Sequence, residues 1–344
     1  MRRMAFWATA GWVAWSFCNP AMSRSEEQPE KRFIDWAGLK NPVLALPDRA
    51  VKDQAVVYDQ GWFYFFVSNR FEENDAETFR QKMAFYRTRD FKNYESFFDP
   101  DLIVSYQGRL GFPESPDVTR IAGAWQMVFQ SRFPGREHFR LYSSTSQDLR
   151  DWSPARELAP DNRPAQRQID GALAEEGGYF YLGYKGRQKF YLTRSESQTL
   201  DGRWLPAERA SAGGHWAENF QFIRLDGVWR LLATAAYPVG HSASGYTRHH
   251  EAFIYTLDGA GAELSDWTRW TRMTHLEIPA EAWNSVMIAN SAFLCDWRGH
   301  DGYFYLFYAG SNDDVEFQKQ SHAKIGVARS RDLTRWRLPG DMRD

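Results

Sequence analysis

The sequence predicts an all-β protein built as a five-bladed propeller, with four antiparallel strands in each blade. Three observations lead to this fold class. A turn glycine followed by an alternating aromatic strand occurs five times, and a polar motif ending in an aromatic residue closes each unit. No apolar period of 3.6 residues runs far enough for a substantial helix. Repeated sheets of this kind bury their faces by packing on one another around a central channel.

The first element of each unit is a glycine hairpin. Glycine takes the positive φ of a tight turn at no steric cost, so a glycine between two apolar runs predicts a hairpin. The five copies read "YDQGWFYFFV", "IAGAWQMVFQ", "EEGGYFYLGY", "LDGVWRLLAT" and "HDGYFYLFYA", around Gly61, Gly123, Gly178, Gly227 and Gly302.

The second element is the closing motif. It predicts the end of each blade and the passage to the next one. The five copies are "RTRDFKNY", "STSQDLRDW", "TRSESQTLDGRW", "ELSDWTRW" and "ARSRDLTRW", ending at Tyr94, Trp152, Trp204, Trp270 and Trp336.

The N-terminus is predicted to lie outside the propeller. Two arginines and a short apolar run, followed by the small residues Ala21 and Ser23, are typical of a secretory signal, so residues 1–23 are assigned to a signal peptide. Residues 24–45 form a polar lead-in, and residues 46–344 form a single propeller domain. We therefore expect an exported protein, periplasmic or secreted, with no membrane contact after signal removal.

Net charge limits the partners. A formal charge of −2 gives no reason to expect nucleic acid or an anionic membrane surface. We expect a monomer.

Carboxylates recur just before the turn glycines. Asp53 and Asp170 each lie eight residues before the glycine of their blade, whereas Glu218 lies nine before its own. One extra residue in the hairpin would explain that difference. Asp117 lies only six residues before its glycine, so its side chain need not sit at the same level. Because the innermost strand of a blade runs along the channel, the spacing predicts Asp53, Asp170 and Glu218 at equivalent positions of the channel mouth.

Several carboxylates near one axis are costly to bury unless they are paired or functional. Held close together, they push one another's pKa values apart, so that one stays protonated while another stays ionised. Hydrolysis of a glycosidic bond needs that division of labour. The alternative interpretation is that these acids cap strand ends or pair with arginines such as Arg49 and Arg167.

Four motifs resemble the five-bladed glycoside hydrolases of families 43 and 32, and most closely family 43, the xylosidases and arabinanases. The resemblance covers Val51 to Trp336, nearly the whole mature chain. The motifs are "VKDQAVVYDQGWFYFF", "SPDVTRIAGAWQMVF", "QIDGALAEEGGYFYLGY" and "WAENFQFIRLDGVWRLL".

The resemblance implies cleavage of an oligo- or polysaccharide by an inverting acid/base mechanism. Asp53 would be the general base and Glu218 the general acid, kept protonated by its surroundings. Asp170 would be the aspartate that raises the pKa of Glu218 and orients the sugar.

Three further residues are candidates for binding substrate: Asp117, Trp216 and Asn290. For Asp117 a role as a strand-entry residue is the favoured alternative, and for Trp216 an indole that packs within the blades is an equal alternative. In blade five the family often carries a histidine that helps to hold a central metal or water, and here Ala289 and Asn290 stand there instead. No cofactor is expected to be required, and the central channel leaves room for a structural metal ion.

The chain departs from the family pattern in two places that affect the substrate more than the chemistry. Gln54 replaces the proline after the base, and "AENF" replaces Glu-Gly-Pro. Two alternatives stay open. A family-32-like enzyme would use Asp53 as a nucleophile with retention, although the Trp-x-Asn-Asp-Pro start of that family is missing. A sugar-binding propeller without catalysis would need no protonated Glu218.

Overall fold

The computed structural model describes most of the chain after the first 32 residues. The fold below belongs to the compact unit Ile34–Asp344. The predicted signal peptide, residues 1–23, lies outside the described residues. No helix in the described part of the chain is both long and apolar enough to cross a membrane. The described residues are 33–72, 79–99, 113–132, 137–159, 167–186, 189–209, 217–242, 245–257, 262–266, 269–313 and 322–342.

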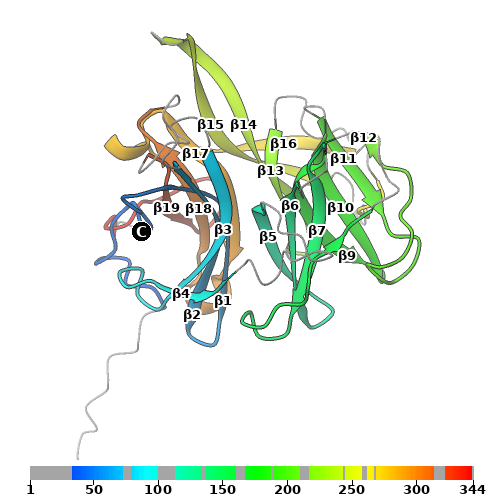
Figure 1. The fold of residues 1–344 in the computed structure, drawn as a ribbon. Helices are drawn as coiled ribbons and strands as arrows, with labels where there is room; N and C mark the ends of the chain where they lie inside the picture. Colours follow the sequence, from blue (N-terminus) through cyan, green and yellow to red (C-terminus); the bar gives the residue numbers. More distant parts are fainter. Residues whose placement is uncertain are drawn as a thin grey trace, which may run out of the picture. The chain divides into compact units, whose positions relative to one another are not determined.

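Five antiparallel sheets make up this unit, each strand pairing with the next one along the chain (Figure 1). Blade I contains β1 Ala50–Asp59, β2 Trp62–Glu72, β3 Phe79–Thr88 and β4 Glu95–Phe98. Blade II contains β5 Glu114–Ile121, β6 Ala124–Ser131, β7 Arg140–Ser146 and β8 Arg156–Glu157. Blade III contains β9 Ile169–Glu176, β10 Tyr179–Gly186, β11 Lys189–Arg194 and β12 Glu208–Arg209. Blade IV contains β13 Ala217–Leu225, β14 Val228–Ser242, β15 Gly245–Leu257 and β16 Trp270–Leu276, and blade V contains β17 Met287–Asp296, β18 Phe304–Ser311 and β19 Lys324–Ser330.

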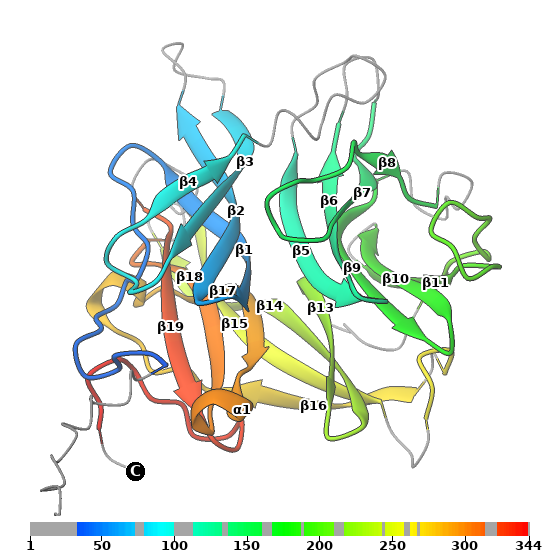
Figure 2. The ribbon, with the colours of Figure 1, turned by 90° about the horizontal axis from the view of Figure 1, so that it is seen from below.

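The sheets close into a ring through their first strands. β1 contacts β5, β5 contacts β9, β9 contacts β13, β13 contacts β17, and β17 contacts β1 again. The order of the blades can be followed along the colours of Figure 2. The predicted five-bladed propeller is therefore confirmed, with β1, β5, β9, β13 and β17 lining the channel.

Blade V differs from the other four because its sheet has three strands. The outer edge of β19 is bridged at Ile325 by Leu44 of the lead-in, and at Arg329 by Arg337 near the C-terminus. Asn41 strengthens the first of these contacts, since its side-chain amide donates to the carbonyl of Val327 and accepts from the same residue's N–H. Both ends of the described chain thus stand where the fourth strand would be.

The predicted hairpins form in four blades. Gly61, Gly123, Gly178 and Gly227 have φ between 79 and 84° in the turns that join the first two strands. The fifth is different, because the helix α1, Arg298–Asp301, stands between β17 and β18, and Gly302 ends that helix with φ 84°. A short 3-10 helix, η3 Ala282–Asn284, precedes β17.

The closing motif is a turn held by its aspartate. In blade II the carboxylate of Asp148 accepts from the backbone N–H groups two and three residues further on, at 2.8 and 2.9 Å, and Leu149 takes a positive φ of 65°. Trp152 then packs edge-on against Phe66 and Phe85 of blade I. The motif therefore ends one blade and joins it to its neighbour. The same turn recurs at Asp90 and Asp332.

Candidate active site

Each innermost strand carries a bulge at the same level of the channel. At that level one non-glycine residue has a φ between 48 and 53°, and the pairing register of the strand shifts around it. Such a conformation costs on the order of 1–3 kcal/mol for each residue, and it is typical of functional sites. The five residues are Asp53, Ser115, Asp170, Asn219 and Ser291.

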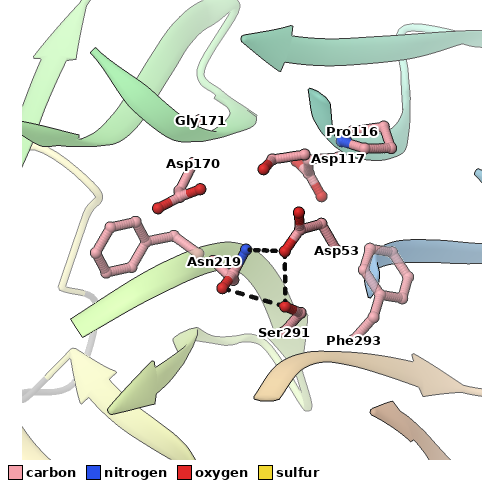
Figure 3. A pocket seen from close by; sticks show the side chains of 10 residues that line it. Asp53, Pro116, Asp117, Asp170, Gly171, Asn219, Ser291 and Phe293 are labelled. Atoms are coloured by element: carbon pink, nitrogen blue, oxygen red, sulfur yellow. Dashed lines mark hydrogen bonds between the residues drawn. The ribbon is translucent and has the colours of Figure 1, made fainter. Parts of the chain in front are cut away.

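These five residues line one pocket on the channel axis. Figure 3 shows the carboxylates of Asp53, Asp117 and Asp170 turned toward the same space. The pocket offers about 20 Å³ to a water-sized sphere, which is enough for a water molecule and too little for a sugar ring.

Asp53 is an ionised carboxylate in this site. It is 5% exposed. Its Oδ1 accepts from Ser291 Oγ at 2.8 Å and from Asn219 Nδ2 at 3.1 Å, and its Oδ2 lies 2.5 Å from Lys52 Nζ. Burial opposes ionisation, but the charge of Lys52 and the hydrogen bonds from Lys52, Ser291 and Ser68 outweigh it and lower the pKa of Asp53.

Asp170 has the opposite electrostatics. Burial, followed by the negative charge of Glu218, raises the pKa of Asp170 to about 7, and Asp53 adds to the effect. Its backbone N–H donates to Gln130 Oε1 at 2.7 Å, which fixes the strand at the bulge. Asp170 therefore keeps its proton to a much higher pH than Asp53 does.

Glu218 does not occupy the position that the spacing predicted. The hairpin of blade IV has no extra residue, because Leu225 pairs with Val228 across two turn residues as Asp59 pairs with Trp62 in blade I. The residue eight before Gly227 is Asn219, and Asn219 takes the bulge position. The predicted equivalence of three acids is therefore wrong. Glu218 stands one residue nearer the mouth, at the level of Lys52 and Glu114.

The surroundings of Glu218 favour its charged form. Lys185 Nζ of blade III lies 2.6 Å from Glu218 Oε2, and His250 Nδ1 lies 3.7 Å from Oε1. Burial opposes ionisation, yet Lys185 and His250 outweigh it and lower the pKa of Glu218. This finding differs from the expectation that the surroundings would keep Glu218 protonated. With a side-chain exposure of 27%, Glu218 is also far more accessible than Asp53, at 3%.

The other predicted site residues have different surroundings. Asp117 lies in β5, two residues deeper along the channel than Ser115, and lines the pocket. Asn290 is buried, contacts His250 Nδ1 through its amide at 2.5 Å, and accepts from Ser291 Oγ. It is therefore linked to Glu218 through His250. Trp216 lies outside the described residues.

Sequence reasoning missed the two lysines of the site. Lys52 and Asp53 are neighbours in a strand, and neighbours normally point to opposite faces. The bulge at Asp53 brings the two side chains into contact. Lys185 comes from β10 of the neighbouring blade, and the sequence has no local signal for that approach. Among the described residues, no three His, Cys, Asp or Glu side chains are grouped to hold a metal ion.

Asp117 should make stability depend on pH. Burial raises its pKa to about 7, above the ordinary value of an unfolded chain, so the folded state binds the extra proton. The free energy of unfolding should therefore fall as pH rises from about 4 to about 7. Asp117→Asn keeps an oxygen to accept from Leu173 N–H and should flatten this slope.

Urea unfolding at several pH values measures the effect. Asp59→Asn, at the other end of β1, is the control and should keep the wild-type slope. Parallel curves for wild type and Asp117→Asn would show that Asp117 is ionised throughout.

Comparison with known proteins identifies the fold through structure alone. The sequence matches no protein-family model and no curated protein. Many solved structures are similar. One is a glycoside hydrolase of family 62 in complex with xylotriose, at 13% identity and a TM-score of 0.60, covering 85% of this chain and 96% of that one.

Two further solved structures share the fold. A family 130 protein, from a family of mannoside phosphorylases with hydrolases that target β-1,2 mannosidic linkages in Candida mannan, has 15% identity and a TM-score of 0.57, over 86% and 88% of the chains. A family 43 protein of a Bacteroides ovatus xyloglucan locus has 12% identity and a TM-score of 0.57, over 87% of this chain and 56% of its own. At these identities the likeness shows the fold, which is that of the propeller glycoside hydrolases. The resemblance seen in the motifs is confirmed at that level.

Proposed function

We propose that this protein is a glycoside hydrolase that inverts the anomeric configuration. The observation that carries the proposal is the separation of charge states at one end of the channel. Asp53 is held as a carboxylate by Lys52, while Asp170 and Glu218 interact and keep one proton between them up to about neutral pH. A base and a proton donor are the two groups that inverting hydrolysis needs.

Asp53 acts as the general base. The pocket below the mouth accommodates a water next to its carboxylate. Asp53 takes a proton from this water as the water attacks the anomeric carbon, and Ser291 and Asn219 hold the carboxylate in place.

The donor is the pair of Asp170 and Glu218. Two interacting carboxyls lose their protons in steps that belong to the pair. Glu218 is the more exposed member and is the one that can reach the leaving oxygen, whereas Asp170 is buried. Glu218 therefore delivers the proton and Asp170 supplies it.

The proposed substrate is an oligo- or polysaccharide of the xylosidase or arabinosidase type. Support comes from the neighbour bound to xylotriose and from an exo-1,5-α-L-arabinanase of a bovine ruminal metagenomic library, 13% identical with a TM-score of 0.54. A monomer exported to the periplasm or the medium fits such a substrate.

A sugar-binding propeller without catalysis is the second candidate. The observation in its favour is that Asp53 and Glu218 each pair with a buried lysine. Carboxylates neutralised in this way can accept hydrogen bonds from sugar hydroxyls without transferring a proton.

One experiment separates the candidates. The protein is screened against aryl glycosides and plant or algal polysaccharides, and the first-formed sugar is examined by NMR. We expect turnover with inverted anomeric configuration. Retention would make Asp53 the nucleophile of a family-32-like reaction. Saccharide binding without turnover anywhere in the panel would establish the second candidate.

A further inference from the structure

Two buried lysines at the channel mouth each form an ion pair with a different carboxylate. Lys52 Nζ lies 2.5 Å from Asp53, and Lys185 Nζ lies 2.6 Å from Glu218. Their side chains are only 11% and 10% exposed. A buried ammonium held this close to a carboxylate stabilises the charged form of its partner.

The acids of the site outnumber these cations. Asp53 and Glu218 have lowered pKa values, and the other three have raised ones, with burial as the largest cause in each. The two acids with lowered pKa values are the two that pair with Lys52 and Lys185. The five acids are Asp53, Glu114, Asp117, Asp170 and Glu218.

Lys185 stands between two of these acids. On β10 it pairs with Ile169, the residue before Asp170, and its ammonium reaches across to Glu218 on β13. Its charge acts on Asp170 as well. Lys185 therefore acts on both carboxyls, through direct contact with Glu218 and through its charge at Asp170.

We propose that Lys185 is a positioning residue that holds Glu218 as a carboxylate in the free site and leaves the proton of the pair on Asp170. The second half of the proposal rests on the proposed function: a bound saccharide displaces Lys185 from Glu218. The proton then passes from the Asp170 carboxyl to the Glu218 carboxylate, and Lys185 pairs with the new anion at Asp170. The charge of the site does not change in this step. Lys185 thereby keeps Glu218 deprotonated until substrate is present.

Other charged groups also face the pair and enter the test. They are His250 on β15 beside Glu218, Lys52 on β1, which acts on both carboxyls, and Asp53 on β1 beside Asp170.

The first test needs no turnover and so is independent of the proposed function. Carboxyl 13C resonances of the substrate-free protein are followed with pH, after assignment with Asp170→Asn and Glu218→Gln. In the wild type, Glu218 should ionise below its usual value and Asp170 near pH 7. If Glu218 titrates near 7 and Asp170 at low pH, the proposal is wrong. The titration itself is measured on the wild type, and the variants serve only to assign the two resonances.

Two variants of Lys185 and one matched control then test the cause. Lys185→Met should raise the pH at which Glu218 ionises by about one to three units, since an opposite charge at this range has an effect of that size. Lys185→Arg keeps the charge and should leave Glu218 ionised at low pH. Lys189→Met removes a lysine from the adjacent strand β11 and should change neither resonance. An unchanged Glu218 titration in Lys185→Met would overturn the assignment.

The kinetic readout tests the second half. With a turned-over aryl glycoside, Lys185→Met should move the alkaline limb of kcat/KM to higher pH, because the pair keeps its proton longer. Lys185→Arg should leave that limb in place. The alkaline limb of Lys185→Met could instead stay fixed while the NMR shift appears as expected. Lys185 would then set the charge of Glu218 in the free site but would have no part in its protonation when substrate binds.

Discussion

Asp53→Ala should lower kcat on the order of 10²–10⁴-fold, because it removes the proposed general base, which would take the proton from water. The loss should be similar for substrates with good and poor leaving groups, since water must be activated in both cases. Steady-state kinetics with a dinitrophenyl glycoside and an alkyl glycoside of the same sugar measure this.

The variant also leaves a lysine without its partner, and that has to be separated from catalysis. Removing one member of a buried ion pair typically costs about 3–5 kcal/mol of stability. The double variant Lys52→Met/Asp53→Asn removes both charges and should recover much of the stability but none of the activity. Recovery of turnover in the double variant would mean that Asp53 serves only to neutralise Lys52. Asp59→Asn in the same strand is the control for the substitution.

The fold could be predicted because its signals are local. A turn glycine such as Gly61 and a closing turn such as the one at Asp148 are each set by a few consecutive residues. Repetition then fixes the number of blades. One detail escaped because it depends on a long-range contact, the bridge from Leu44 to Ile325. The helix α1 escaped for another reason, because the glycine that ends it, Gly302, was interpreted as the turn of a hairpin.

The candidate site could be predicted only in part. Counting back from the turn glycine located Asp53 and Asp170, both at bulges. The same count in blade IV leads to Asn219. Glu218 was chosen instead because one extra residue was assumed in that hairpin, and this assumption was wrong. A strict eight-residue rule would have found all four residues that precede a tight hairpin, including Ser115.

The charge states could not be read from the chain, because they depend on side chains that meet across blades. The pKa of Glu218 is lowered because Lys185 reaches it from blade III. The pKa of Asp170 is raised by burial and then by the charges of Glu218 and Asp53, which approach from blades IV and I. The pKa of a buried carboxyl follows such neighbours more than its own sequence context.

Glu218→Ala should separate substrates by their leaving groups. Without the donor, an alkyl glycoside has to expel a strongly basic alkoxide, and its kcat should fall on the order of 10²–10⁴-fold. A dinitrophenolate leaves without protonation, so the dinitrophenyl glycoside should lose far less. The ratio of the two losses in kcat, measured under the same conditions, shows whether Glu218 acts as the general acid.

Glu114 provides a matched control for this experiment. It is a half-buried carboxyl one residue before the bulge of blade II, as Glu218 is in blade IV, and it accepts from Gln130 Nε2 at 3.1 Å. Glu114→Ala removes a carboxyl from the same level of the mouth, so any loss should be equal for the two substrates. Equal losses in Glu218→Ala as well would remove Glu218 from the role of acid. If Asp170→Asn then showed the dependence on leaving group, the buried member of the pair would be the donor, and Glu218 with Lys185 would form part of the sugar-binding wall.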